Sequence, residues 1–387
     1  MKFKSCGYRV AHLPTSVGGN PHGLSTHLEK LGIESETWIF QQNVFHYPCT
    51  RVIWNESDGV LLRELKRWRA ILCVAWSFDI IHFNYGTSWA TPVPIFRASD
   101  SSLKAKLRRF VAGAYLNILS YAELNLYRLF RRPMFVHYQG DDARQGDFCL
   151  SMFEHSLAQY VEPGYYSTES DAFKRRMILR MERYCRKLYA VNPDLMHVLG
   201  SKARFIPYCH ISLKDWKPKY PSRQSRPLRI GHAPSHRGVK GTDIILSVLD
   251  ELAAAGHRFE VVLVEGLSNE EARRRYEEVD VMIDQLHAGW YGGLAVELMA
   301  MGKPVMVYIR EEDLQFIPAD MQKDLPVIRV THTSLKDDLK SVLAMTREDI
   351  IELGMRSRRY VEKWHDPLRI AADIKKDYEL ALAGAGR

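Results

Sequence analysis

The sequence lacks the features that mark a secreted or membrane-spanning protein. No uninterrupted apolar run reaches about 18 residues, the length that spans a bilayer, and residues 1–13 are too polar for a secretory signal. The six cysteines are scattered and form no Cys-x-x-Cys pair: Cys6, Cys49, Cys73, Cys149, Cys185 and Cys209. In a chain of 387 residues they are expected to be reduced, structural thiols. We therefore expect a cytoplasmic protein.

The common motifs for metals, dinucleotides and nucleic acids are also missing. There is no Asp-x-Asp and no cluster of histidines and cysteines at ligand spacing, so no metal is expected. No Gly-x-Gly-x-x-Gly follows the first predicted strand, which makes a dinucleotide oxidoreductase the least favoured enzyme class. No nucleic-acid motif and no Ser/His/Asp arrangement is present either.

What the sequence does contain is an excess of positive charge on an ordinary globular composition. A net charge of +8 and a pI near 9.0 fit an anionic partner, such as a sugar nucleotide, a phospholipid surface or a nucleic acid. Hydrophobic residues make up 46% of the chain and charged residues 26%. The length is sufficient for two domains with a large core.

Short apolar strands alternate with helices in both halves of the chain, which predicts α/β domains with parallel sheets. In the first half we expect strands at 8–13, 37–40, 79–83, 134–138 and 187–191, and helices at 24–31, 61–76 and 171–186. In the second half we expect strands at 228–232, 259–264, 279–283, 304–308 and 326–330, and helices at 242–255, 269–278 and 292–301. The proline-rich, charged segment 216–227 is predicted to link the two domains.

The first candidate site is the loop 231–242, between the first strand and helix of the second half. It lies at the carboxyl end of a predicted parallel strand, where open α/β sheets bind ligands. Arg237 and Lys240 could neutralise a diphosphate there, although the lysine lacks the Walker A spacing. A solvated basic loop explains this segment equally well.

The second candidate is the segment 289–305, in which a glycine-bearing loop runs into a short apolar helix. Trp290, Tyr291, Gly292 and Gly293 precede or open the helix, whose N-terminal N–H groups and dipole could hold a phosphate. Glu297, one turn further, could accept hydrogen bonds from sugar hydroxyls. The alternative is a turn with a structural glutamate. Together the two segments predict a nucleotide-sugar site.

The first half offers weaker candidates at two strand ends. Gly18 and Gly19 would let the backbone of the first strand–helix loop approach a ligand closely, but a plain loop is the commoner explanation. A histidine and charged residues follow another strand and could orient a hydroxyl or assist proton transfer: His137, Asp141, Asp142 and Arg144. Side chains that merely satisfy the loop backbone are an equal alternative.

The segment 97–132 is basic and aromatic. It combines eight Lys and Arg side chains with Tyr115 and Tyr121, a pattern that could rest on anionic lipid: Arg97, Lys104, Lys106, Arg108, Arg109, Arg128, Arg131 and Arg132. A solvated helix pair with one buried apolar face is slightly favoured.

These motifs resemble a retaining glycosyltransferase of the GT-B fold, similar to glycosyltransferase family 4 (glycosyl transferases group 1). The resemblance is strongest over residues 232–305 and extends to residues 192–195 and 359–367. It implies two Rossmann-like α/β domains with parallel sheets facing a central cleft. The expected boundaries are 1–212 for the acceptor-binding domain, 213–362 for the donor domain and 363–387 for a helix that returns to the first domain.

The resemblance also implies roles for the candidate residues. Contacts to the donor are expected from Gly18, Gly19, Arg237, Lys240, Trp290, Tyr291, Gly292, Gly293 and Glu297. The acceptor side is expected at Asp141, Asp142 and Arg144, and the catalytic residues at His137, Asp142, Arg237 and Lys240. A UDP- or GDP-sugar would be the co-substrate, with no cofactor and no metal. The acceptor would be a glycan or a lipid-linked molecule, with peripheral contact to anionic membrane and no nucleic-acid partner.

One position departs from the family pattern. The donor motif has two glutamates separated by seven residues. Glu297 matches the second, but Gly289 stands at the first. His287, Trp290 or a backbone amide could substitute for the missing carboxylate. Two alternatives therefore stay open: a GT-B sugar-nucleotide epimerase, and a non-catalytic subunit that binds a nucleotide.

Overall fold

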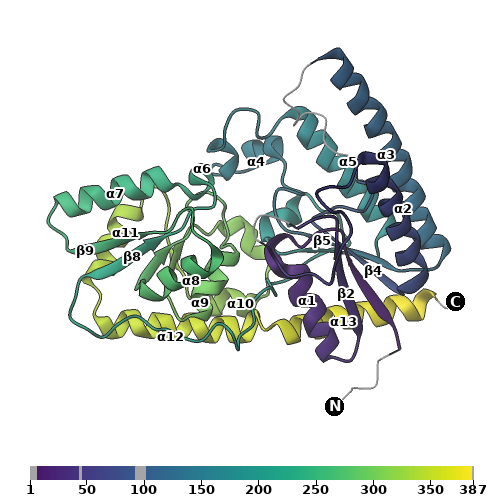
Figure 1. Ribbon diagram of the computed structural model, residues 1–387. Coiled ribbons are helices and arrows are strands. Elements are labelled where there is room, and N and C mark those ends of the chain that lie inside the picture. The colour runs from purple at the N-terminus through teal and green to yellow at the C-terminus, as the bar shows by residue number, and fades with distance from the viewer. Residues whose placement is uncertain (1–6, 43–45, 92–101, 386–387) are drawn as a thin grey trace. The chain divides into compact units, whose positions relative to one another are not determined.

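The computed structural model describes residues 7–42, 46–91 and 102–385. Cys6 and residues 97–101 of the basic segment lie outside these ranges. The chain divides into two compact units. Unit 1 takes the residues up to 145, residues 167–210 and the residues from 367 onward, and unit 2 takes 146–166 and 211–366. The sequence-based boundaries differ from this division mainly in assigning 146–166 to the first domain (Figure 1).

Unit 1 contains a seven-stranded sheet in the order β3-β2-β1-β4-β5-β6-β7, and the strand pairs are parallel. The strands are β1 (Arg9–Leu13), β2 (Glu34–Ile39), β3 (Arg51–Val52), β4 (Ile80–Asn84), β5 (Met134–Tyr138), β6 (Lys187–Ala190) and β7 (Ala203–Phe205). The helices are α1 (Asn20–Lys30), α2 (Val60–Ser77), α3 (Leu103–Leu129), α5 (Thr168–Tyr184) and α13 (Pro367–Ala385), with short 3-10 turns η1 (Val17–Gly19) and η4 (Pro193–His197).

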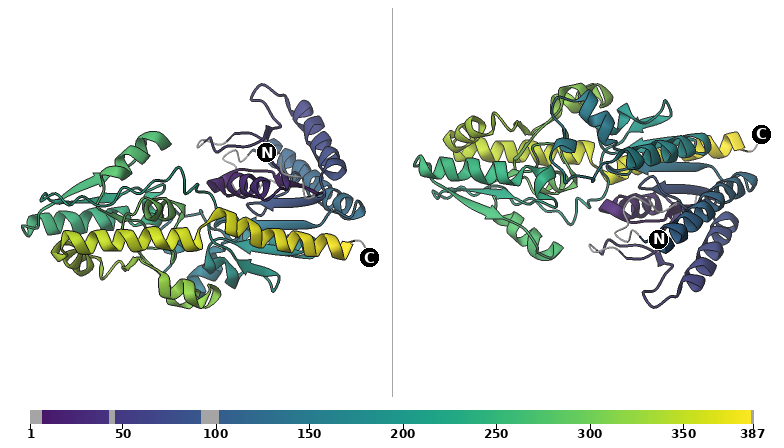
Figure 2. Two further views of the ribbon diagram at one scale, coloured as in Figure 1. Left: turned by 90° about the horizontal axis from the view of Figure 1, so that it is seen from below. Right: turned by 90° about the horizontal axis from the view of Figure 1, so that it is seen from above.

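The two faces of this sheet carry different side chains because strand residues alternate between faces. Ile81, Phe83 and Val136 belong to an apolar core with residues of α2, α3 and α5. His82 and His137 point to the opposite face, where they stack on each other and Tyr378 of α13 contacts His82. Figure 2 shows α2 and α13 on opposite sides of the strands. Both faces of β4 and β5 are thus covered, and every residue of these two strands is buried.

Unit 2 contains a five-stranded parallel sheet in the order β12-β11-β10-β8-β9. The strands are β8 (Leu228–His232), β9 (Phe259–Leu263), β10 (Val281–Ile283), β11 (Val305–Val307) and β12 (Ile328–Arg329). The helices are α4 (Gly146–Met152), α6 (Arg237–Lys240), α7 (Thr242–Ala254), α8 (Asn269–Glu278), α9 (Gly293–Ala300), α10 (Ala319–Asp324), α11 (Leu335–Ala344) and α12 (Arg347–Trp364), with 3-10 turns η3 (Leu157–Gln159) and η5 (Glu311–Phe316).

The predicted α/β class with parallel sheets is confirmed. The edge strands β3 and β7 were not predicted from the sequence, and several predicted elements differ at their ends. The helix expected at 24–31 starts earlier, at Asn20, and the strand expected at 326–330 shrinks to Ile328–Arg329. The segment 216–227 has neither helix nor strand. None of the helices in the described ranges is long and apolar enough to cross a membrane.

Candidate functional site

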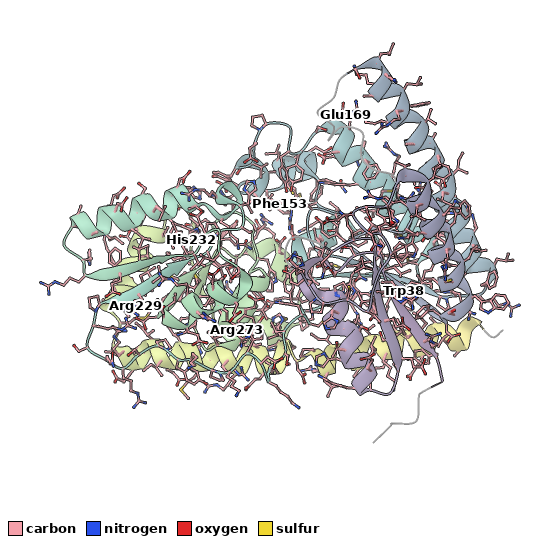
Figure 3. The ribbon with its side chains drawn as sticks, in the orientation of Figure 1. Trp38, Phe153, Glu169, Arg229, His232 and Arg273 are labelled. Carbon is pink, nitrogen blue, oxygen red and sulfur yellow. The ribbon has the colours of Figure 1, made fainter. Side chains whose placement is uncertain are left out.

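The strand order of unit 2 reverses between β8 and β10, because the chain continues from β8 to the neighbour on one side and later returns on the other. Such a reversal opens a crevice outside the carboxyl ends of the two strands, where doubly wound sheets bind ligands. His232 ends β8 and is labelled in Figure 3. Its ring bonds to the carbonyl oxygen of Ile283 (2.9 Å) and the hydroxyl of Thr242 (2.9 Å), which ties both strands to α7.

Lys240 and the start of α9 meet at this point through a buried aspartate. The ammonium of Lys240 donates to Asp284 Oδ1 at 2.5 Å, and the backbone N–H of Gly292 donates to Asp284 Oδ2 at 3.1 Å. Asp284 is fully buried, and Lys240 is 7% exposed. The carboxylate therefore fixes the lysine beside the N-terminus of α9. Asp284 was missed from the sequence, although it is the first residue after β10.

Helix α9 presents its first turn to this cluster. Its N-cap is Gly292, and a Cβ there would lie 3.9 Å from both Lys240 Nζ and Asp284 Oδ2. The first N–H groups of a helix have no partner inside the helix, so the end is positively polarised. Glu297 is half-buried one turn further along. Burial raises the pKa of Tyr276 of α8, and the negative charges of Glu297 and Asp284 raise it further. These three groups therefore share one neighbourhood.

Arg237 lies on the same short helix as Lys240 but has other partners. Its guanidinium donates to both carboxylate oxygens of Glu265 (2.9 and 3.0 Å) and to Asp243 (2.9 Å). The side chain is 46% exposed. The structure thus does not join Arg237 to the Lys240–Asp284 pair, and the diphosphate contact shared by Arg237 and Lys240 stays a prediction.

The side chains of Trp290 and Tyr291 lie in the core of unit 2. Trp290 is 1% exposed and Tyr291 is 0% exposed, and their rings stack with centroids 4.4 Å apart. The hydroxyl of Tyr291 is 2.9 Å from the hydroxyl of Tyr360 and 2.9 Å from His365 Nε2. Both rings anchor the loop, and a ligand could reach only the backbone of these two residues.

The departure at Gly289 has a physical explanation. Gly289 has φ +79°, and a Cβ there would lie 2.7 Å from the guanidinium carbon of Arg310. Arg310 is held by Asp313 (2.8 Å) and by the carbonyl oxygen of His155 (3.1 Å), and it lies over the ring of Phe153 at 3.8 Å. Arg310 therefore fills the space that a glutamate at 289 would need.

Residues 146–166 complete the surroundings of α6. The ring of Tyr160 stacks on His287 at 3.6 Å and 4°, and His155 Nε2 is 2.9 Å from His287 Nδ1. A Cβ on Gly238 would lie 2.2 Å from the carbonyl oxygen of Tyr160. Burial and the neighbouring histidines lower the pKa of His287 to about 4, so its ring is neutral at pH 7. No group of three or more metal-binding side chains occurs among the described residues.

In unit 1 the sheet order reverses between β1 and β4, and the glycine loop follows β1. Gly18 and Gly19 have φ +66° and +70°, a left-handed conformation that glycine adopts most easily. A Cβ on Gly18 would lie 2.6 Å from the side-chain oxygen of Gln139. The loop after β1 therefore lies against the loop after β5.

His137 belongs to a row of buried rings across four adjacent strands. His12, His82, His137 and Tyr189 lie with neighbouring centroids 5.1, 4.8 and 5.0 Å apart. His82 Nε2 is 2.7 Å from His137 Nδ1, and His82 Nδ1 bonds to the hydroxyl of Tyr378. Burial lowers the pKa of His137 to about 3. The ring is thus neutral, hydrogen-bonded and 2% exposed.

The charged residues after β5 are held by their own loop. The N–H groups of Gln139 and Gly140 donate to Asp142 at 3.0 and 2.7 Å. Burial raises the pKa of Asp142 to about 7, although these hydrogen bonds oppose the shift. Arg144 donates to Asp194 (2.7 Å) and Asp141 (3.2 Å). Asp194, of η4, was not singled out as a site residue from the sequence.

No protein-family model and no curated protein sequence matches this chain. Several solved structures are similar to it in fold. Sucrose-phosphate synthase from Thermosynechococcus elongatus has a TM-score of 0.61 at 13% identity, over 97% of this chain and 100% of that chain. A glycosyltransferase from Rickettsia africae has 0.56 at 12%, over 97% and 98%. HepE of Anabaena, in complex with UDP-glucose, has 0.55 at 11%, over 96% and 99%. The chain therefore has the GT-B fold, with two Rossmann-like parallel-sheet domains.

Proposed function

We propose that the protein is a glycosyltransferase. It moves a sugar from a nucleotide-sugar donor to a hydroxyl group of a glycan or glycolipid, with retention of configuration and without a metal. The observation that carries the proposal is the junction of Lys240, Asp284 and the N-terminus of α9 at the strand reversal of unit 2. Similarity to GT-B proteins, one of them solved with UDP-glucose, agrees with it.

In this proposal the donor diphosphate binds at Lys240 and the first turn of α9. An ammonium group has three N–H donors, and Asp284 receives one hydrogen bond from Lys240. The helix dipole and the remaining N–H donors attract phosphate oxygens. Because Asp284 holds the lysine before the donor arrives, the positive charge is already in place when negative charge develops on the leaving phosphate. Arg237 adds positive charge from the same helix.

Glu297 is the proposed ribose-binding residue. Its half-buried carboxylate lies one turn into α9 and can accept hydrogen bonds from two hydroxyls. The backbone of the loop from Trp290 to Gly293 is proposed to contact the donor. The proposed donor is a UDP- or GDP-sugar, so its base is uracil or guanine.

Unit 1 is proposed to supply the acceptor side. Gly18 and Gly19 allow close approach of the backbone, and Asp141, Asp142 and Arg144 offer polar groups after β5. His137 acts as a neutral hydrogen-bonding group, because burial keeps it unprotonated. The acceptor hydroxyl attacks the face from which the nucleotide leaves, so no enzymic nucleophile is needed.

The proposal includes peripheral contact with an anionic membrane at the cytoplasmic side, through α2 and α3. Both helices expose large apolar side chains at helical spacing: Leu61, Leu65, Trp68, Leu72 and Trp76 on α2, and Leu103, Leu107, Phe110, Ile118 and Tyr121 on α3. The indole N–H of Trp68 donates to the hydroxyl of Tyr115 at 2.9 Å, which joins the two helices. Exposed basic residues flank these stripes, as in surfaces that bind anionic lipid.

The central test is a charge-neutral double variant, Lys240→Met with Asp284→Asn. It removes the ammonium without leaving a buried carboxylate unpaired, so the fold should survive. A thermal-shift screen with UDP-, GDP- and ADP-sugars first identifies the donor, and release of the nucleoside diphosphate then measures transfer. We expect about a hundredfold loss of transfer in the double variant. Full activity would contradict the site.

Three further outcomes separate the alternatives. The anomeric configuration of the product, read by NMR, tests retention. Formation of an epimer from donor alone would indicate an epimerase. Nucleotide binding without turnover across the donor panel would indicate a non-catalytic subunit.

A further inference from the structure

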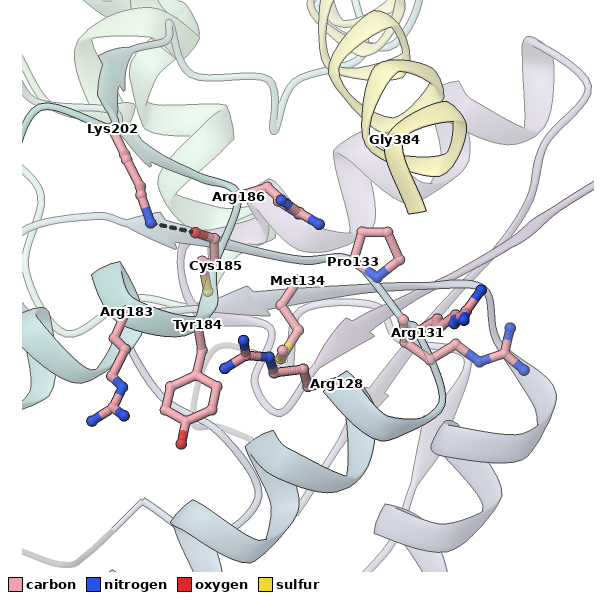
Figure 4. A pocket seen from close by; sticks show the side chains of 11 residues that line it. Arg128, Arg131, Pro133, Met134, Arg183, Tyr184, Cys185, Arg186, Lys202 and Gly384 are labelled. Atoms are coloured by element: carbon pink, nitrogen blue, oxygen red, sulfur yellow. Dashed lines mark hydrogen bonds between the residues drawn. The ribbon is translucent and has the colours of Figure 1, made fainter. Parts of the chain in front are cut away.

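A second cationic site lies in unit 1, at the opposite edge of the sheet from the loops discussed above. A cavity of about 360 Å³ opens at the amino ends of β5 and β6, where Met134 begins β5 and Arg186 precedes β6 (Figure 4). Six cationic side chains line it: Arg128, Arg131, Arg132, Arg183, Arg186 and Lys202. None of the described lining residues is acidic.

Most of this charge is not neutralised by the protein. Arg132 pairs with Asp79 at 2.8 Å, and Lys202 donates to the carbonyl oxygens of Glu182 and Cys185 at 2.5 and 3.3 Å. The other four arginines of the cavity form no ion pair within the described part of the chain. Like charges crowded around one hollow repel each other, so an anion bound there would stabilise the unit.

The backbone at the end of α3 gives a second, independent reason. The helix ends in a Schellman motif, in which Arg132 N–H bonds to the carbonyl of Tyr127 at 2.8 Å and Arg131 N–H to that of Arg128 at 2.9 Å. The residue in the left-handed position is Arg131, with φ +55°. Glycine is the usual residue there, because a side chain is strained in this conformation. Arg131 therefore occupies a position where glycine would give a less strained backbone.

We propose that this cavity binds an anion that carries two or more phosphoryl groups. Guanidinium groups present paired N–H donors that match phosphate oxygens, and arginine outnumbers lysine five to one around the cavity. The volume lies at the lower end of the range for small-ligand sites. The phosphoryl groups could belong to the headgroups of an anionic bilayer or to a soluble polyphosphate, and the cavity chemistry is the same for both.

The test compares two variants that lose the same charge. Arg131→Gly with Arg186→Gln removes two cations of the cavity, and Arg223→Gln with Arg356→Gln removes two exposed arginines of unit 2. Calorimetric titration with sodium tripolyphosphate at low salt should show roughly tenfold weaker binding only in the cavity variant. Because Arg131→Gly relieves the left-handed strain, the unfolding temperature should not fall. Equal binding by both variants would overturn the proposal.

Two further arms identify the source and separate this site from the proposed transfer site. Tripolyphosphate binding at the cavity should persist in Lys240→Met/Asp284→Asn, whatever that variant does to glycosyl transfer. Vesicles of phosphatidylcholine with phosphatidylglycerol, compared with phosphatidylcholine alone, test the lipid source. Loss of vesicle binding in the cavity variant assigns a headgroup. Loss of tripolyphosphate binding alone assigns a soluble anion.

Discussion

Each unit has a buried polar cluster at the place where its strand order reverses, but the two clusters differ in chemistry. In unit 1, His12 of β1 pairs with His82 of the adjacent β4, and their neighbours in the row are other rings. In unit 2, Asp284 accepts hydrogen bonds from the ammonium of Lys240 at 2.5 Å and from the N-terminus of α9 at 3.1 Å. The first cluster has no formal charge at pH 7, because burial lowers the pKa values of its histidines.

The difference shows that a strand reversal alone does not make a phosphate site. The rings of unit 1 lie within their strands, whereas the cluster of unit 2 lies beyond the carboxyl ends of β8 and β10, where ligands bind in such folds. Unlike the histidines of unit 1, Lys240 has a carboxylate beside it. This counter-charge from Asp284 allows the lysine to stay charged although it is almost buried. A row of neutral rings can pack a sheet and accept or donate hydrogen bonds, but it offers a diphosphate no charge.

The largest effect should come from breaking the ion pair of unit 2 on one side only. Lys240→Met leaves Asp284 buried without its cation and should cost about 3–5 kcal/mol of unfolding free energy. The double variant with Asp284→Asn should recover most of this loss. Denaturant unfolding of both proteins checks the difference. Equal stability of the single and double variants would show that Asp284 does not need the lysine.

A smaller loss of unfolding free energy is expected when Gly289 is replaced by the glutamate that family 4 glycosyltransferases have at this position. Gly289→Glu requires a side chain at φ +79° and displaces the guanidinium of Arg310, so we expect a loss of about 2–3 kcal/mol. Gly289→Ala in the same assay separates the cost of the left-handed backbone and of a Cβ against Arg310 from the further cost of the carboxylate side chain. A stable, more active Gly289→Glu variant would mean that Arg310 moves aside readily.

Acid should lower the free energy of unfolding of unit 1, because its buried histidines are neutral in the folded state. The pKa of His12 is lowered from 6.5 to about 3 by burial, so the unfolded chain binds more protons than the folded one below pH 6.5. The free energy of unfolding is therefore highest above pH 6.5 and falls as the pH drops toward 3. At pH 5 the loss should be about 2 kcal/mol for each such histidine.

His12→Phe provides the matched control for this pH dependence. Neither ring nitrogen of His12 has a hydrogen-bond partner among the described residues, so phenylalanine should not destabilise the protein at pH 7. Its loss of stability between pH 7 and pH 5 should be smaller than that of the natural chain. An unchanged pH dependence would place the titrating groups elsewhere.

The smallest effect should come from Arg237. Because its exposed guanidinium is already paired with Glu265 and Asp243, Arg237→Gln should lower transfer only roughly tenfold, against roughly a hundredfold for the Lys240 pair. Nucleoside diphosphate release measures both. A larger loss for Arg237→Gln would show that this side chain leaves its carboxylates when the donor binds.

Sequence periodicity was sufficient to predict most strands and helices, because burial on both faces of a parallel sheet leaves apolar runs that short-range patterns detect. The same reasoning reached Lys240 and Gly292 from loop chemistry. Asp284 could have been found as the polar residue directly after a buried strand. The sequence could not reveal that Arg310 occupies the space beside Gly289. That contact depends on how the residues around η5 pack against a loop that is distant in the chain.

The association of residues 146–166 with unit 2 restricts how the chain can be divided. The backbone passes between the units four times, at 145/146, 166/167, 210/211 and 366/367. A fragment of residues 211–366 alone would lose Tyr160, which covers Gly238 and stacks on His287. A single proteolytic cut therefore cannot release either unit intact. Separate expression of residues 211–366 would require residues 146–166 to be supplied with them, as a fused segment or an added peptide.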